Sequence, residues 1–274
     1  MPAKTKSKLE VAIQAALAAG KIQMASYGQL KTSEIHFKSR NDFVTKVDKT
    51  CETRIIDIIG KNFPGHGYLA EESGKTSGSG TYWIIDPLDG TSNYVHQFPM
   101  FSVSIGVYSQ GLLQAGVVYD PLHHEMFTAE KGKGAYLNNK RIRVSKTPVL
   151  ADALMATGIP FRARNRWNQY MRSFNDISLG SAGLRRGGSA ALDLAYVACG
   201  RFDGFWEIDL SPWDIAAGAL LIQEAGGRIT DMWGSSKYLQ NGDILASNAV
   251  THNELQKLTS EAFKPLKIDK MRGL

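Results

Sequence analysis

The chain has 274 residues, 43% of them hydrophobic, and a formal net charge of +6. This length predicts one or two domains with a sizeable core. No apolar run reaches the ~18 residues typical of a membrane-spanning helix, and the basic N-terminus leads into a mixed segment rather than a signal peptide. We therefore expect a cytoplasmic protein without a membrane span. Its two cysteines, Cys51 and Cys199, lack a CxxC partner and are predicted to be free thiols.

The first quarter of the chain predicts two helices and two short strands. Apolar residues recur at helical spacing in the helices, and the second helix is closed by the Phe63-Pro64-Gly65 turn. The predicted helices run over 8–27 and from Asp48 onward, and the predicted strands cover 35–38 and 68–70. The second strand delivers the carboxylate of Glu71 at its end. The small polar segment 74–80 indicates a mobile loop.

A third strand, 83–85, is apolar throughout and turns polar abruptly at Asp86. Because Pro87 has no N–H for a sheet ladder, we expect the strand to end there. Asp86 and Asp89 lie three residues apart on the turn that follows, so both carboxylates can point the same way. The Leu88 carbonyl lies between them. Such oxygen ligands suit hard cations such as Mg²⁺, and the turn is predicted to bind a pair of divalent cations.

The residues Gly90, Thr91 and Ser92 follow this turn and predict a helix start. Backbone N–H groups at such a start favour a phosphate anion. Taken alone, Asp-Pro and Asp-Gly are far more often ordinary turn dipeptides than parts of a metal site. This segment is therefore either an ordinary turn or a site that binds metal and phosphate, and the rest of the chain has to decide between the two.

The segment 100–144 predicts an antiparallel sheet, because strand patterns follow one another with hairpin residues at the joins. The predicted strands are 101–108, 112–119, 125–129, 135–137 and 142–144. From about Ser145 helices and strands alternate, which indicates α/β layering. The predicted strands there are 153–157, 183–186, 202–207, 228–230 and 244–246, and the predicted helices are 165–178, 189–199, 213–225 and 252–263. We expect two subdomains, 1–145 and 146–274, that share an interface.

The helix that begins near Trp213 carries a candidate ligand. Ser211 suits the N-cap, and Pro212 suits the first helical position, which places Asp214 in the first turn. An acid in this place stabilises a helix by ~0.3–1 kcal/mol without any metal, and the segment alone does not decide between the two roles. Asp152 and Asp193 are predicted to be caps or surface pairs.

Five motifs in order along the chain resemble those of the inositol monophosphatase family of metal-dependent, lithium-sensitive phosphatases. They are Asn41-Asp-Phe-Val-Thr-Lys-Val-Asp48, Glu71-Glu-Ser73, Asp86-Pro-Leu-Asp-Gly-Thr91, Gly188-Ser-Ala-Ala191 and Trp213-Asp-Ile-Ala-Ala-Gly218. They span about residues 38–227, and the resemblance is greatest to bacterial members. It implies a layered α-β-α-β-α sandwich of mixed α+β and α/β type with the active site between the halves.

The resemblance also implies a role for each motif residue. Two or three Mg²⁺ ions would be held by Glu71, Asp86, Asp89, Asp214 and the Leu88 carbonyl. One ion would activate a water, and another would neutralise the leaving alkoxide. Thr91, hydrogen-bonded to Asp48, and Glu71 would orient that water, while the Gly90 and Thr91 amides hold the phosphate.

Five further positions are assigned to the substrate side by the same resemblance. Gly188, Ser189 and Ala190 would line a sugar or inositol pocket, and Glu207 would accept a hydrogen bond from a substrate hydroxyl. Lys38 would be a mobile positive charge near the metals. Asp209 departs from the family pattern and puts the identity of the alcohol in doubt.

The implied substrate is myo-inositol monophosphate, with fructose-1,6-bisphosphate, NADP and histidinol phosphate as alternatives, because one fold and ligand set serves many substrates. A homodimer is implied by the family alone. The basic excess leaves a second function open, that of an accessory protein that binds RNA or a transcription complex. Solvated surface charge is the simpler explanation of that excess.

Overall fold

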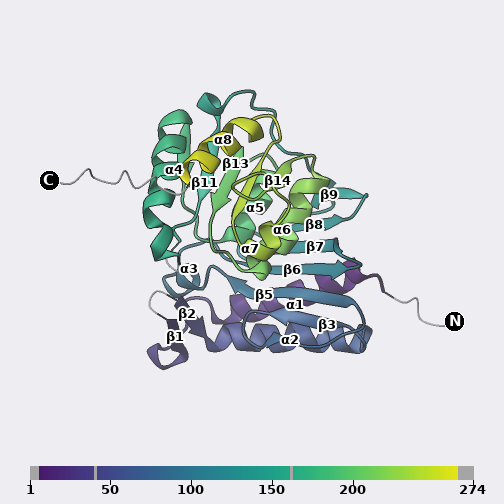
Figure 1. The fold of residues 1–274 in the computed structure, drawn as a ribbon. Helices are drawn as coiled ribbons and strands as arrows, with labels where there is room; N and C mark the ends of the chain where they lie inside the picture. Colours follow the sequence, from purple (N-terminus) through teal and green to yellow (C-terminus); the bar gives the residue numbers. More distant parts are fainter. Residues whose placement is uncertain (1–5, 40–41, 161–162, 265–274) are drawn as a thin grey trace, which may run out of the picture.

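The computed structural model describes residues 6–39, 42–160 and 163–264, apart from the side chains of 37–39 and 42. Its helices and sheets alternate in five layers, as the ribbon shows (Figure 1). This arrangement confirms the α-β-α-β-α sandwich expected from the sequence. Among the helices of the described ranges, none has both the length and the apolar character needed to cross a bilayer.

The first helical layer consists of α1 (Lys8–Ser26) and α2 (Lys46–Asn62), which pack against each other and on the large sheet. α2 begins two residues before the predicted Asp48, because Thr45 is its N-cap. Asp48 is the third residue of the helix and accepts a hydrogen bond from the Thr45 backbone N–H, which completes a capping box. Cys51 of α2 and Cys199 are free cysteines, as expected.

The large sheet has eight strands and supplies the second layer. In spatial order they are β10 (Lys140–Arg141), β9 (Gly134–Leu137), β8 (Glu125–Glu130), β7 (Leu112–Asp120), β6 (Ser102–Ser109), β5 (Thr81–Asp89), β3 (Gly67–Ala70) and β4 (Gly74–Lys75). The strands from β5 to β10 are antiparallel to their neighbours, which confirms the predicted meander. β3 pairs with β5 in parallel, so both strands end at the same edge.

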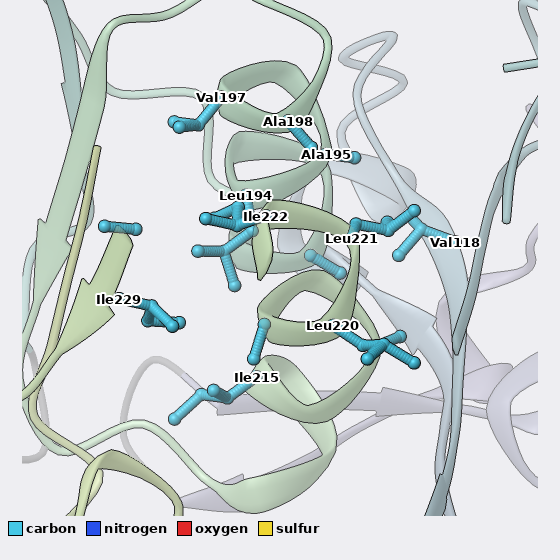
Figure 2. Packing of buried hydrophobic residues seen from close by; sticks show 14 of the residues in the cluster. Val118, Leu194, Ala195, Val197, Ala198, Ile215, Leu220, Leu221, Ile222 and Ile229 are labelled. Atoms are coloured by element: carbon cyan, nitrogen blue, oxygen red, sulfur yellow. The ribbon is translucent and has the colours of Figure 1, made fainter. Parts of the chain in front are cut away.

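The central layer consists of α5 (Ala190–Ala198) and α6 (Pro212–Glu224), and most of its residues are buried between the two sheets. Figure 2 shows Leu221 of α6 against Val118 of β7, while Ile222 lies beside Leu194 of α5. Burying such side chains stabilises the fold by roughly 1.5–3 kcal/mol each. The same cluster contains residues of both predicted subdomains.

The second sheet and two outer helices complete the sandwich. Its strands, in spatial order, are β12 (Gly183–Arg185), β11 (Leu154–Thr157), β13 (Gly204–Glu207), β15 (Ile244–Ser247) and β14 (Arg228–Thr230). The outer helices are α4 (Trp167–Gly180) and α8 (His252–Ala262), and the smaller elements are β1 (Ile35–Ser39), β2 (Asp42–Thr45), α3 (Thr91–Val95) and α7 (Tyr238–Asn241). β12, β11 and β13 are parallel, and the other pairs are antiparallel.

The prediction that the central strand ends at Pro87 was wrong. β5 continues to Asp89, and its register with β6 shifts between Asp86 and Asp89. Asp86 faces Ser104 and Asp89 faces Ser102, so two residues of β5 lie opposite one residue of β6. This bulge accommodates the proline, because its missing N–H falls where the ladder is interrupted.

Three further boundaries differ from the sequence predictions. The strand expected at 142–144 is replaced by the short β10, although the Ile142 N–H still bonds the Ala135 carbonyl at 2.9 Å. Part of the loop predicted at 74–80 forms β4 on the sheet edge. β2 was not predicted as a strand, because its partner β1 rather than its own pattern holds it extended.

Candidate active site

A cavity of about 140 Å³ opens where β5 ends and where α5 and α6 begin. It brings together eleven of the residues that the sequence singled out. They are Glu71, Asp86, Leu88, Asp89, Gly90, Thr91, Gly188, Ser189, Ala190, Glu207 and Asp214. Lys38 lies in β1, and its side chain is outside the described part of the chain.

Three carboxylates form the centre of this cavity. Asp86, Asp89 and Asp214 each offer an oxygen, and these oxygens lie within 4.8 Å of one another. Asp86 and Asp89 come from the bulged end of β5, and Asp214 comes from the first turn of α6. The α6 helix starts at Ser211 and Pro212 as predicted, and a capping box fixes Asp214 because its Oδ2 accepts the Ser211 N–H at 2.8 Å.

Burial and mutual repulsion raise the pKa values of two carboxyl groups of this cluster. Burial raises the pKa of Asp89 to about 6, and it raises the pKa of Asp86 well above the ordinary value. The negative charges of Glu71, Asp89 and Asp214 raise the pKa of Asp86 further. Several buried carboxylates that share one space are stable as anions only with cations between them. The all-oxygen set of donors therefore fits hard divalent cations such as Mg²⁺.

Glu71 and the Leu88 carbonyl lie at the same cavity. The turn after β3 places Glu71, whose backbone N–H bonds the Ile85 carbonyl at 3.1 Å. The next residue in this turn, Glu72, donates its N–H to the buried Glu52 carboxylate at 2.8 Å. The Leu88 carbonyl accepts the Thr91 hydroxyl at 3.0 Å.

Thr91 lies within hydrogen-bond distance of Asp48, as the resemblance implied. Its Oγ1 is 3.0 Å from Asp48 Oδ1, while Oδ2 of the same carboxylate accepts from the Thr45 hydroxyl at 2.6 Å. Burial raises the pKa of Asp48 to about 6. Thr91 is the first residue of α3, and Gly90 before it has φ +91°, where a Cβ would come within 2.9 Å of the Met100 carbonyl. Only glycine suits that position.

Ser189 forms a hydrogen bond with a carboxylate, which was not predicted from the sequence. Its Oγ donates to Asp89 Oδ2 at 2.5 Å, and the Ala191 N–H donates to the same oxygen at 2.8 Å. Ser189 is fully buried and is the N-cap of α5. It lines the cavity, and its hydrogen bond orients Asp89.

The opposite side of the cavity is bounded by Glu207, at the end of β13, and by Gly158. A Cβ at Gly158 would lie only 2.0 Å from Glu207 Oε2, so the glycine makes room for this carboxylate. The exposed Asp209 also lines the cavity. Gly158 was not predicted as a site residue, because its role depends on a segment far away in the chain.

The expectation that Asp193 is a cap or surface acid was wrong. The side chain is 1% exposed and lines the cavity, and its Oδ1 has no hydrogen-bond partner among the described residues. Burial raises its pKa well above the ordinary value. Its position four residues after Ser189, on the same face of α5, was the available signal. Arg186, two residues before Gly188, was also missed and lines the cavity.

The sequence and the fold were compared with known proteins. A family model described as "Inositol monophosphatase family" matches residues 5–266. Inositol-1-monophosphatase of Mesorhizobium japonicum is 42% identical and aligns over 94% of this chain and 97% of its own length. Nus factor SuhB of Pseudomonas aeruginosa is 45% identical over 88% of this chain and 91% of its own length.

Two solved structures share the fold. The extragenic suppressor protein suhB from Bartonella henselae matches with a TM-score of 0.89 and 40% identity, over 92% of this chain and 98% of that chain. Inositol monophosphatase from Anabaena (Nostoc) sp. PCC 7120 matches with a TM-score of 0.82 and 42% identity, over 92% and 95%.

Proposed function

The chain belongs to the inositol monophosphatase family, and from this premise we propose that it is a Mg²⁺-dependent phosphomonoesterase that hydrolyses myo-inositol monophosphate. The observation that carries the proposal is the group of Asp86, Asp89 and Asp214, two of them buried, in one cavity with Glu71. The M. japonicum relative, which carries the name inositol-1-monophosphatase, supports this choice of substrate.

The proposed ligands of two or three Mg²⁺ ions are Glu71, Asp86, Asp89, Asp214 and the Leu88 carbonyl. When bound, such ions supply the Lewis acidity that activates a water and that neutralises the charge on a leaving oxygen. The chain prepares for this charge by holding its carboxylates in place with backbone hydrogen bonds. Orientation before the ligand arrives avoids a reorganisation cost during the reaction.

The polar groups around the carboxylates position the reactants. The Thr91 hydroxyl lies between Asp48 and the Leu88 carbonyl, from where we propose that it orients the attacking water together with Glu71. The backbone N–H groups of Gly90 and Thr91 bind the phosphate oxygens. Glu207 accepts a hydrogen bond from a hydroxyl of the alcohol.

The proposed activity is tested by phosphate release with and without Mg²⁺ and Li⁺. The substrates are inositol 1-phosphate, fructose-1,6-bisphosphate, histidinol phosphate, adenosine 3′,5′-bisphosphate and NADP. We expect inositol 1-phosphate to have the largest kcat/KM and Asp89→Asn to abolish turnover, because the change removes a negative ligand. Asp152→Asn is the control, since Asp152 is exposed and lies outside the cavity. Absence of Mg²⁺-dependent turnover by the wild type would contradict the proposal.

A second function is proposed because several relatives are named Nus factor SuhB. We propose that the chain, with its net charge of +6, also binds RNA or a transcription complex. Binding to RNA should weaken steeply with salt and should survive Asp89→Asn. Salt-independent binding, or none, would exclude this role.

The proposed setting of both functions is a cytoplasmic homodimer. Light scattering on the purified chain tests the oligomeric state, and a monomer at all concentrations would contradict it.

A further inference from the structure

An ion pair lies beside the cavity without lining it. Arg166 Nη1 donates to Asp243 Oδ2 at 2.6 Å, and Nη2 donates to Oδ1 at 2.8 Å. Asp243 is 2% exposed on its side chain and Arg166 is 26% exposed. A two-point pair with one member buried holds a more definite geometry than an exposed surface pair.

The pair is bonded to a third segment of the chain, and this segment does line the cavity. This segment, Glu207–Leu210, is named the strap here, and all four of its residues line the cavity. Asp243 Oδ1 accepts the Asp209 N–H at 3.2 Å, and the Gly242 carbonyl accepts the Leu210 N–H at 2.9 Å. The hydrogen bond to Asp243 raises the pKa of Arg166, and the negative charges of Asp243 and Asp209 raise it further, since opposite charges favour the ionised form.

The strap has a backbone conformation that needs support. Asp209 has φ +63°, in the left-handed region that residues other than glycine adopt at a cost. Gly242 has φ +73°, and a Cβ there would come within 2.3 Å of the Leu210 carbonyl, so the two segments lie in close contact. Such strained residues persist where their surroundings hold them, and they concentrate at functional sites.

The strap belongs to a different segment from Asp86 and Asp89, and it ends directly before Ser211, the N-cap of α6. Asp86 and Asp89 come from β5, and Asp214 is fixed by its own hydrogen bond from the Ser211 N–H. A displacement of the strap would therefore leave Asp86 and Asp89 in place, and the hydrogen bond between Ser211 and Asp214 limits how far the end of the strap at Leu210 can move. The displacement would move Glu207, the proposed acceptor of a hydrogen bond from the alcohol, and Asp209, which lines the same cavity.

Building on the proposed phosphatase function, we propose that Arg166 and Asp243 are positioning residues that hold the strap and thereby determine which alcohol the site accepts. Neither touches the substrate. They act on the substrate through the strap, which they hold at the Asp209 N–H. Their effect should therefore be larger for a phosphate ester whose alcohol carries further hydroxyl groups than for an ester of a plain ring. The pair therefore affects selectivity between phosphate esters rather than the ability to hydrolyse them.

The test compares inositol 1-phosphate with phenyl phosphate, which has no hydroxyl groups for the strap to contact. The variants are Arg166→Gln, which removes the ion pair, and Arg166→Lys, which keeps the charge and one donor. Arg201→Gln is the matched control, because Arg201 forms a two-point pair with Glu125 and neither residue lines the cavity. Values of kcat and KM are measured for both esters with Mg²⁺, and Tm is measured for each variant.

We expect Arg166→Gln to lower kcat/KM for inositol 1-phosphate by about tenfold, chiefly through KM, because a misplacement of ~1 Å can cost about 10²-fold and the Leu210 N–H still holds the strap to Gly242 in the variant. For phenyl phosphate the change should stay within about twofold. Arg166→Lys should recover part of the loss, and Arg201→Gln should leave the ratio of the two kcat/KM values unchanged, even if its Tm falls.

Two results would overturn the positioning role. One is an equal loss for both esters, which indicates general damage, and the other is no loss for either ester. If the wild type hydrolyses neither ester, calorimetric binding of the two ligands takes the place of kcat/KM in the same comparison. If it neither hydrolyses nor binds inositol 1-phosphate, the proposed function fails as well, and the wild-type data alone reveal this.

Discussion

At the level of single residues, each of the three clustered carboxylates uses an oxygen for a hydrogen bond that fixes its position. Asp86 accepts the Leu88 N–H, and Asp214 accepts the Ser211 N–H. Asp89 accepts both the Ser189 hydroxyl and a backbone N–H of α5. The donors to Asp86 and Asp214 are two and three residues away in the chain, whereas those to Asp89 are about 100 residues away, so the orientation of Asp89 depends on the packed fold.

The Thr91 hydroxyl gives a prediction at this scale. Thr91→Ala removes the hydroxyl that lies 3.0 Å from Asp48, and we expect kcat for inositol 1-phosphate to fall by roughly 10²–10⁴-fold, as for loss of a group that assists proton transfer. Thr91→Ser keeps the hydroxyl and should retain most of the activity. Steady-state phosphate release measures both variants. Equal kcat values for Thr91→Ala and the wild type would show that the hydroxyl has no part in the reaction.

At the level of elements, the position of α6 is determined by glycines on the sheet. A Cβ at Gly116 of β7 would lie 2.9 Å from the Ala217 carbonyl, and a Cβ at Gly106 of β6 would lie 2.8 Å from the Ala216 Cβ. The helix therefore approaches the strands closely. Because Asp214 is in its first turn, this approach also determines how near Asp214 lies to the carboxylates of β5.

Gly116→Ala tests this dependence. The added methyl group meets backbone atoms that cannot rotate away, so we expect a loss of about 1–3 kcal/mol in stability and weaker Mg²⁺ binding. Gly60→Ala is the control, because nothing lies within 4 Å of that position in the exposed face of α2. It should stabilise the protein by about 0.5–1 kcal/mol. Calorimetric Tm and Mg²⁺ titration measure both, and unchanged Mg²⁺ affinity in Gly116→Ala would contradict the coupling.

At the level of the whole molecule, the predicted halves 1–145 and 146–274 share a core. One cluster of buried residues combines Val118 and Phe127 of the large sheet with Leu194 of α5 and Leu221 of α6. We therefore propose that the halves are subdomains that unfold together. Calorimetry should show one transition whose van't Hoff and calorimetric enthalpies agree. Two resolved transitions would show that the halves are independent.

The buried carboxyl groups should make the stability of the protein depend on pH. In the metal-free protein, burial raises the pKa values of Asp48 and Asp89 from 3.8 to about 6. The folded chain then holds these protons more tightly than the unfolded chain. This contribution to stability is complete below pH 3.8 and is lost as the pH rises through about 6.

Magnesium should have the opposite dependence, because it binds ionised carboxylates in competition with protons. We expect added Mg²⁺ to raise Tm strongly near pH ~7.5 and weakly near pH ~5. Thermal unfolding at both pH values, with and without Mg²⁺, measures the difference. In Asp89→Asn the Mg²⁺-dependent increase should be much smaller at either pH. An equal increase at both pH values would show that these carboxylates do not hold the metal.

Most of the elements and the central motif were predictable because their signals are local. The Ser211-Pro212 start of α6, the apolar strand before Asp86 and the hairpins of the meander each depend on residues that are close together in the chain. Caps, turns and apolar periodicity act within a few residues, so the sequence alone carries them. The resemblance added the order of the motifs and the expected layers.

What the sequence determined by itself is therefore where Asp86, Asp89 and Asp214 lie relative to the strand and the helix that carry them. Only the tertiary structure decided how β5 passes Pro87, that Asp193 lines the cavity, and that Arg166 reaches Asp243 beside the strap. Each of these depends on a partner from another segment of the chain: β6 for the bulge, the cavity walls for Asp193 and the turn before β15 for Arg166. Contacts of this kind form when the layers pack, and no local pattern specifies which distant residue will be opposite.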